Sequence, residues 1–221
     1  MIQLKNLTKN FVRNKSGFDA VNNVSLDIKK GEFVAVIGHS GSGKTTLFNM
    51  IAGLIHPTEG SIYIDGQEFS AMKEKQKSKF RNENMGYVLQ GQSLLNNFTI
   101  LDNVCMPAYL SGEAKAFKER ALELLKEIGL EDLANDYPSN LSGGEMRRVS
   151  IVRAMINNPK VLLADEPTSN LDPENAHKVM KMLQEISNNG TTVLLSTHEL
   201  EYLEYVDSVI KMEKGEIKES L

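Results

Sequence analysis

The sequence predicts an α/β fold in which a largely parallel sheet is preceded by a β-rich section and interrupted by a helical one. Two observations predict the parallel sheet: continuous apolar runs typical of buried strands, and helical segments between those runs. The runs lie within residues 33–38, 161–167 and 191–198. A third observation separates the flanking sections. Residues 1–11 and 20–28 alternate between polar and apolar side chains, whereas the section from 91 to about 138 carries helical spacing.

The N-terminal part is predicted to consist of short strands joined by turns, with one helix. Half-buried strands are predicted at residues 1–11 and 20–28, a fully buried parallel strand at 33–38, a helix at 45–54 and a strand within 60–69. Asp65 and Gly66 carry a turn signal inside the last of these segments. This part is therefore expected to form an antiparallel β-subdomain beside the first core strand.

The middle of the chain is predicted to be a helical subdomain inserted into the α/β core. Residues 113–130 predict an amphipathic helix with Lys and Glu on its polar side. Its apolar face comprises Phe117, Ala121, Leu124, Leu125 and Ile128. The core then resumes with a helix at 173–188 and a strand or hairpin near 207–219. We assign residues 91–154 to the helical subdomain, and residues 1–90 and 155–221 to the core with its β-subdomain.

Composition limits the classes of protein to which the chain can belong. Its 221 residues, 41% apolar and 24% charged, are ordinary for a globular protein with one large domain. A net charge of −4 argues against nucleic acid as a partner. A single cysteine indicates a reducing compartment. The start of the sequence lacks the apolar centre of a signal peptide, and no apolar run is long enough to cross a bilayer. We therefore expect any membrane role to come through a partner.

GHSGSGKTT, residues 38–46, fits the P-loop pattern G-x-x-x-x-G-K-[ST] at every defined position. Glycines let such a loop wrap a β-phosphate with its backbone N–H groups. Lys44 is predicted to reach the β- and γ-phosphates, and the Thr45 hydroxyl to bind Mg²⁺. His39 occupies a variable position and is expected only to shape the loop. The predicted nucleotide-binding residues here are Gly38, His39, Ser40, Gly41, Ser42, Gly43, Lys44, Thr45 and Thr46.

VLLADEP, residues 161–167, is an apolar strand that ends in two acids, where a parallel sheet opens onto its ligand. Asp165 is predicted to hold Mg²⁺. Glu166 is predicted to point to the other side of the strand's end and to polarise an attacking water. Together with the P-loop, this motif predicts a nucleoside triphosphate site. It does not distinguish a transporter from a helicase or a kinase.

LSGGEMRR, residues 141–148, begins a predicted helix with a serine and two glycines. Such a helix start is a second candidate anion-binding site, and we call residues 142–144 the second seat. LSGGE is similar to LSGGQ, the signature motif of the ATP-binding cassette (ABC) family. SNLD, residues 169–172, matches that family's D-loop. Gln90 ends the predicted strand MGYVLQ, as a Q-loop glutamine does, and His198 ends TTVLLSTH, as the switch histidine does. Phe11 matches a position where the family has an aromatic residue that stacks on adenine. The chain thus resembles an ABC ATPase over essentially its whole length.

The resemblance implies a P-loop NTPase (RecA-like) core and a role for each matching residue. Lys44, Gln90, Glu166 and His198 are implied to be catalytic, and Gln90 also to bind Mg²⁺ beside Thr45 and Asp165. Two copies are implied to dimerise head to tail around two ATP molecules, so that each signature motif completes the other copy's site. The implied residues of that shared interface are Ser142, Gly143, Gly144 and Asp172. The chain departs from the family's pattern at Phe11, Glu145 and Arg147, the last two in place of glutamine. Glu145 places an acid near the start of the predicted signature helix, which is a favourable position in the helix dipole.

LLADEPTSNLD, the spacing within residues 90–112 and the short C-terminus resemble the group of ABC ATPases that contains MacB, LolD and FtsE. This resemblance implies peripheral attachment to the cytoplasmic face of the membrane. The implied partner is a permease with four transmembrane helices and a large extracytoplasmic domain. It implies an exporter or a mechanotransmission system for lipoprotein, antimicrobial peptide, drug or haem. The alternatives are a cell-division-type signalling ATPase without cargo, and a soluble non-transport ABC ATPase.

Overall fold

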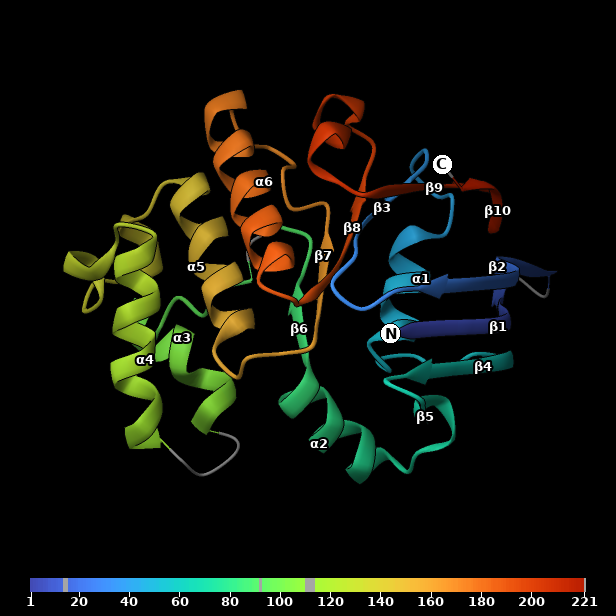
Figure 1. Cartoon of the computed structure of the whole chain (residues 1–221), viewed down its shortest axis with the longest axis horizontal. Helices are drawn as coiled ribbons and strands as arrows, with labels where there is room; N and C mark the ends of the chain where they lie inside the picture. The colour runs from blue at the N-terminus through green and yellow to red at the C-terminus, as the bar shows by residue number, and fades with distance from the viewer. Residues whose placement is uncertain (14–15, 92, 110–113, 221) are drawn as a thin grey trace.

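The computed structural model describes residues 1–13, 16–91, 93–109 and 114–220, which form two sheets and a separate group of helices (Figure 1). Among these residues, the larger sheet has six strands in the order β10-β9-β3-β8-β7-β6. They are β3 (Phe33–Ile37), β6 (Met85–Val88), β7 (Val161–Asp165), β8 (Thr192–Thr197), β9 (Ser208–Glu213) and β10 (Glu216–Ser220). Neighbours are parallel throughout except for β10, which is antiparallel to β9. The predicted α/β fold class is confirmed.

Helices cover both faces of the large sheet, which explains why its central strands are apolar on both sides. Val34 and Val36 of β3 point to one face and pack in a cluster with α1 (Lys44–Ile51) and the second sheet. Ala35 points to the other face and packs in a cluster with α6 (Pro173–Asn188). This alternation follows from the pleat of a strand. The large sheet is therefore the centre of the core.

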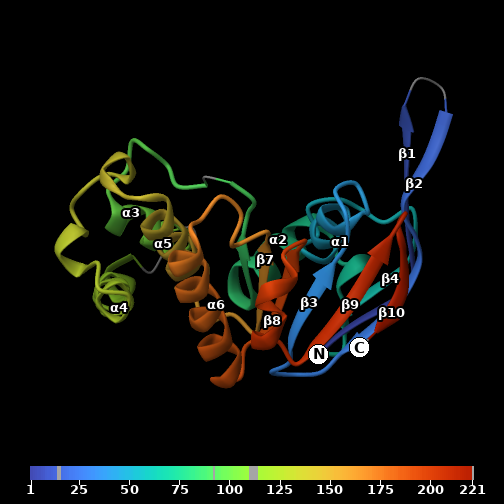
Figure 2. The same ribbon diagram turned by 90° about the horizontal axis from the view of Figure 1, so that it is seen from above.

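The second sheet is antiparallel, with the strand order β2-β1-β4-β5. Its strands are β1 (Ile2–Arg13), β2 (Ser16–Ile28), β4 (Glu59–Ile64) and β5 (Gln67–Glu68). The predicted turn at Asp65 and Gly66 joins β4 to β5. These two residues have φ angles of 52° and 76°. Two consecutive positive φ angles are the mark of a type I′ hairpin turn. The far end of the β1–β2 hairpin projects beyond the rest of the sheet (Figure 2).

The remaining helices lie mainly on the opposite side of the large sheet from the β1–β2 hairpin (Figures 1 and 2). They are α3 (Ile100–Tyr109), α4 (Ala114–Glu127) and α5 (Gly143–Met155), while α2 (Glu74–Asn84) leads into β6. A cluster of its own holds the α3–α4–α5 group together, with Ala121 and Leu125 fully buried in it. Phe117, Leu124 and Ile128 pack against that cluster, so the predicted apolar face is confirmed. Residue 113, where this helix was predicted to begin, lies outside the described residues.

Short 3-10 helices complete the secondary structure at Phe69–Ala71, Glu131–Leu133, Pro138–Asn140 and Leu200–Tyr205. Within the part of the chain that is described, no helix has both the length and the apolar character needed to span a membrane.

Candidate functional site

A tight loop joins β3 to α1 and contains the glycines predicted to cradle a phosphate. Gly41 and Gly43 have φ angles of 77° and 106°, which side chains other than glycine rarely adopt. A Cβ on Gly43 would lie 2.2 Å from the carbonyl oxygen of Ala20, and a Cβ on Gly38 would lie 2.4 Å from that of Met212. The loop is therefore closed on both sides by neighbouring strands. Only glycine fits at positions 38 and 43.

Lys44 and Ser42 provide polar groups suited to a phosphate. Lys44 is only 5% exposed, and its Nζ donates to the carbonyl oxygens of Gly38 at 2.7 Å and His39 at 3.2 Å. Among the described residues no carboxylate lies within ion-pair distance of this ammonium. The buried Ser42 hydroxyl has no hydrogen-bond partner there either. A buried cation without a counter-ion beside an unpaired hydroxyl fits an anionic ligand.

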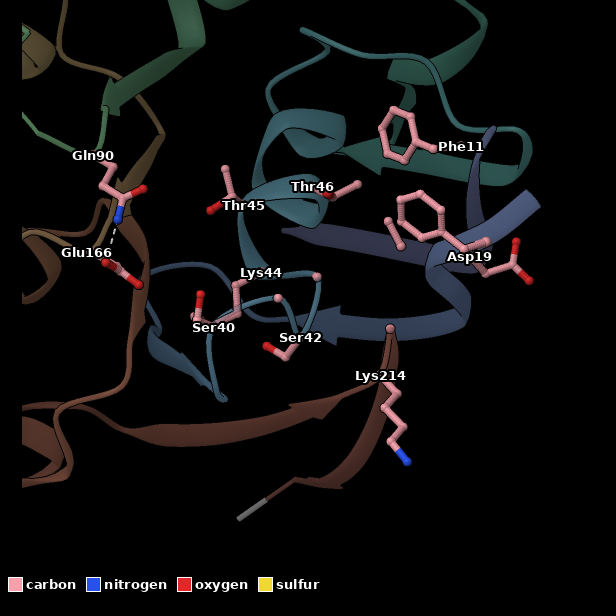
Figure 3. A pocket seen from close by; sticks show the side chains of 15 residues that line it. Phe11, Asp19, Ser40, Ser42, Lys44, Thr45, Thr46, Gln90, Glu166 and Lys214 are labelled. Carbon is pink, nitrogen blue, oxygen red and sulfur yellow. Dashed lines mark hydrogen bonds between the residues drawn. The ribbon is translucent and has the colours of Figure 1, made fainter. Parts of the chain in front are cut away.

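A cavity of about 400 Å³ extends from this loop to the β1–β2 hairpin (Figure 3). Ser40 and Thr45 line it beside the loop, while Gln90 and Glu166 line its far wall. The remaining lining residues are Phe11, Phe18, Asp19, Ala20, Gly41, Ser42, Gly43, Lys44, Thr46, Lys214 and Gly215. In Figure 3 the side chain of Lys214 points away from the cavity. The volume and the elongated arrangement suit a nucleotide, with its phosphates at the loop and its base at the hairpin.

Two aromatic rings lie at the hairpin end of the cavity. Phe11 of β1 was predicted there, whereas Phe18 of β2 was not. The two residues pair across the hairpin, and their ring centroids are 6.0 Å apart. They are 37% and 50% exposed, so both offer ring surface for stacking. The register of the hairpin could have indicated Phe18, because a residue that pairs with Phe11 across the hairpin lies on the same face of the sheet.

Three predicted catalytic side chains meet because they follow adjacent parallel strands, β6, β7 and β8. Glu166 Oε2 accepts a hydrogen bond from Gln90 Nε2 at 2.6 Å (Figure 3), and His198 Nδ1 lies 3.5 Å from Glu166 Oε1. Glu166 adopts the left-handed conformation, with φ 47°. Its backbone N–H donates to both the carbonyl and the hydroxyl oxygen of Ser196. Carboxylate, amide and imidazole are thus gathered at one edge of the sheet.

Asp165, the residue before Glu166, is buried at the end of β7 and is 2% exposed. Its carboxylate accepts a hydrogen bond from the Ser196 hydroxyl. Thr45 and Gln90 line the cavity, whereas Asp165 is not among its lining residues. A hydroxyl, an amide oxygen and a carboxylate are oxygen ligands of the kind Mg²⁺ binds when phosphates and water supply the rest. The chemistry of these donors fits the metal, and their role stays a prediction.

The predicted second seat begins at Ser142, the N-cap of α5. The hydroxyl and the backbone N–H of Ser142 both donate to Glu145 Oε2, at 2.6 Å and 2.8 Å. Glu145 N–H donates back to the Ser142 hydroxyl at 3.4 Å, which completes a capping box. These bonds, the hydroxyl's first, hold the pKa of Glu145 below its usual range. The Glu145 side chain was predicted to lie favourably in the helix dipole. It also accepts the hydrogen bond of the Ser142 hydroxyl, which is then not available to another acceptor.

Asp172 caps α6 and is joined to the signature helix α5. Its Oδ1 and Oδ2 accept hydrogen bonds from the backbone and side-chain nitrogens of Asn175, at 3.0 Å and 2.7 Å. The side-chain bond is the largest cause of the lowered pKa of Asp172. Asn175 Oδ1 in turn accepts from Arg148 at 3.2 Å. A Cβ on Gly144 would lie 2.5 Å from Asn175, so this glycine permits the close packing of α5 on α6.

The second seat lies apart from the first cavity within one chain. None of Ser142, Gly143, Gly144 and Asp172 is among the cavity's described lining residues. Gly143 instead lines a smaller hollow of about 150 Å³, together with Gly91 and Asn170. The structure therefore gathers the P-loop, Gln90 and Glu166 around one space and leaves the signature motif outside it.

Two arginines of α5, neither predicted as a functional residue, hold the segment that contains Gln90. Arg147 donates to the carbonyl oxygen of Leu89 at 2.9 Å. Arg153 donates to the carbonyl and hydroxyl oxygens of Ser93, at 2.7 Å and 2.8 Å. Burial lowers the pKa of both guanidinium groups. The signature helix and the Gln90 segment are therefore fastened together on both sides of the glutamine.

Comparisons with known proteins agree with this geometry. The profile of the family described as ABC transporter matches residues 21–169. An uncharacterised ABC transporter ATP-binding protein of Methanocaldococcus jannaschii is 41% identical over 220 residues, covering 99% of this chain and 98% of that protein. The lipoprotein-releasing system ATP-binding protein LolD of Buchnera aphidicola is 39% identical, with 98% and 96% covered. A solved dimeric, post-hydrolysis ATP-binding cassette bound to ADP and Pi superposes with a TM-score of 0.90 at 35% identity, with 100% and 98% covered.

Proposed function

Because the chain belongs to the ABC transporter family and is an ATPase of the MacB/LolD-like group, we propose that two copies dimerise head to tail around two Mg-ATP and drive a membrane permease. One observation carries the proposal. The cavity has its catalytic groups on one side, while the signature seat lies outside it in the same chain. The γ-phosphate of a bound ATP would thus lack contacts on its open side. A second copy supplies them in this arrangement, and the similar solved cassette is dimeric.

The first chain's residues bind and orient the nucleotide. Backbone N–H groups of the P-loop and the N-terminus of α1 face the phosphates, and Lys44 exchanges its loop carbonyl partners for phosphate oxygens. Thr45, Gln90 and Asp165 would hold Mg²⁺, which neutralises phosphate charge when bound. Phe11 and Phe18 stack on the base. The triphosphate is in this way fixed with its terminal group toward Glu166.

Glu166 is the general base of the proposed reaction. It takes the proton of a water positioned in line with the γ-phosphate. The water oxygen bonds to the γ-phosphorus while the bond to the bridging oxygen breaks and ADP leaves, and His198 hydrogen-bonds the transferred group. The same carboxylate accepts a hydrogen bond from Gln90 Nε2, and its remaining lone pairs are open to the water. Gln90 therefore couples the arrival of nucleotide and water to the segment that Arg147 and Arg153 fasten to α5.

Ser142, Gly143 and Gly144 act on the partner copy's nucleotide. The N-terminus of α5 carries roughly half a positive charge, which stabilises charge on the γ-phosphate from its open side. Asp172, exposed at the N-cap of α6, contacts the partner near the same place. Because Arg148 and Asn175 join these two groups, a shift of the signature seat is transmitted to Asp172.

The membrane partner we propose is a permease with four transmembrane helices and a large extracytoplasmic domain, bound from the cytoplasmic face. Similarity to LolD, named for lipoprotein release, and to MacB, named for macrolide export, supports this type of system. The test is to reconstitute the chain with such a permease in lipid vesicles and to measure ATP turnover. We expect stimulation that Glu166→Gln abolishes. If the chain binds no such permease and hydrolyses ATP as fast without the permease as with it, the proposal is wrong.

A further inference from the structure

The Ser142 hydroxyl, which the proposed dimer presents to the partner copy's ATP, is already in use within its own chain. It donates to Glu145 Oε2 at 2.6 Å, and the backbone N–H of the same serine donates to the same oxygen at 2.8 Å. A hydroxyl has one proton to give. For Ser142 to donate to a phosphate oxygen, its hydrogen bond to the Glu145 carboxylate has to break.

Glu145 also places a negative charge beside the second seat. Among the described residues, no Lys, Arg or His nitrogen lies within 4 Å of its carboxylate. Arg148, whose charge favours the ionised form of Glu145, directs its guanidinium to Asn175 instead. A phosphate oxygen that accepted from the Ser142 hydroxyl would stand about 5 Å from Glu145 Oε2, given two hydrogen-bond lengths. Two anions at that separation repel each other appreciably even near a protein surface.

We propose that Glu145 is a positioning residue that withholds the Ser142 hydroxyl and repels the partner copy's γ-phosphate, so that it weakens the ATP-bound dimer. This inference rests on the head-to-tail dimer of the proposed function. The weakening is useful to a machine that must separate after each turnover, because a dimer held too tightly would release products slowly.

A purely structural role for Glu145 has the opposite sign. If the carboxylate only caps α5, then changing it weakens the cap and lowers or leaves unchanged the affinity of the dimer. Under the proposal, Glu145→Gln raises that affinity. The amide oxygen of glutamine still accepts from the backbone N–H of Ser142, while the charge is gone. The direction of the change therefore separates the two roles.

The experiment measures ATP-dependent dimerisation by sedimentation, with Glu166→Gln in every variant so that ATP is not consumed. Glu145→Gln is compared with Glu123→Gln, which removes the same charge from an exposed position on α4. At low salt we expect Glu145→Gln to tighten each site about tenfold, so that the dissociation constant of the two-site dimer falls about a hundredfold. The gain should shrink as salt screens the repulsion, and Glu123→Gln should change nothing. Binding of ATP to the monomer, measured in parallel, should be equal in all variants.

An unchanged or weaker Glu145→Gln dimer overturns the inference alone, because the parent dimer still supports the proposed function. An equal gain in Glu123→Gln also overturns it, since net charge would then be the cause. If no variant dimerises with ATP although all bind it, the proposed head-to-tail dimer itself fails. If only Glu145→Gln dimerises, both ideas are supported.

Discussion

Glu166→Gln tests the proposed base directly, because the two side chains are nearly equal in shape. In the structure Glu166 Oε2 accepts from Gln90 Nε2, and Glu166 Oε1 faces His198 Nδ1 at 3.5 Å. A glutamine can keep both contacts, with its oxygen toward Gln90 and its NH₂ toward a neutral imidazole. The substitution should therefore leave the fold and the cavity intact. What it removes is the carboxylate that we propose accepts the proton of water.

Loss of a general base costs about 10²–10⁴ in rate, which corresponds to about 3–5 kcal/mol of transition-state stabilisation. ATP binding should be unchanged or slightly tighter, because one negative charge leaves the wall of a cavity that holds phosphates. The assay is single-turnover release of phosphate, measured beside equilibrium binding of a fluorescent nucleotide. Glu201→Gln is the matched control, since it removes the same charge from an exposed residue outside the cavity lining.

Three results would refute the assignment. Hydrolysis by Glu166→Gln within threefold of the parent rate means that another group takes the proton. An equal loss in Glu201→Gln means that the effect comes from overall charge or stability. A loss of nucleotide binding in Glu166→Gln would show instead that this side chain supports the cavity.

Three further predictions address other parts of the site. Ser142→Arg should block hydrolysis without weakening nucleotide binding to the monomer, and normal turnover would contradict a site shared between copies. Phe18→Ala and Phe11→Ala should each weaken ATP binding up to about tenfold through lost stacking, but leave the binding of inorganic triphosphate unchanged. Calorimetry with both ligands measures this difference. Equal losses of affinity for the two ligands would exclude a contact with the base. Gly43→Ala should abolish nucleotide binding and lower Tm, because its Cβ would meet a backbone carbonyl at 2.2 Å. Gly41→Ala, with no atom within 4 Å, should cost only about 1 kcal/mol of backbone strain in thermal unfolding, and equal effects of the two changes would refute the steric argument.

Local pattern was sufficient for several features that depend on residues close in the chain. The buried strand at 33–38, the helix at 173–188 and the Asp65-Gly66 turn were all predicted, because side-chain periodicity and turn chemistry act within a few residues. The P-loop is a contiguous motif of the same kind. Two of its glycines, Gly41 and Gly43, adopt positive φ angles, which glycine allows without strain.

Features set by strand register, by contacts between distant segments or by side-chain rotamers were missed or only partly predicted. Phe18 faces the cavity because the hairpin register sets it opposite Phe11. Arg147 and Arg153 reach the Gln90 segment across about 60 positions of sequence. Glu145 was predicted as a favourable charge in the helix dipole, yet its hydrogen bond to the Ser142 hydroxyl depends on the rotamers of both side chains.

By itself, the sequence determined which residues end strands and begin helices, and hence that Gln90, Glu166 and His198 each follow a strand. Only the tertiary structure decided that those strands are neighbours, in the order β8-β7-β6, so that the three side chains meet. Strand order is fixed by how helices pack on the two faces of the sheet, which no short stretch of sequence encodes. The same packing keeps the signature motif out of its own chain's cavity, and the Ser142 hydroxyl there is bound to Glu145.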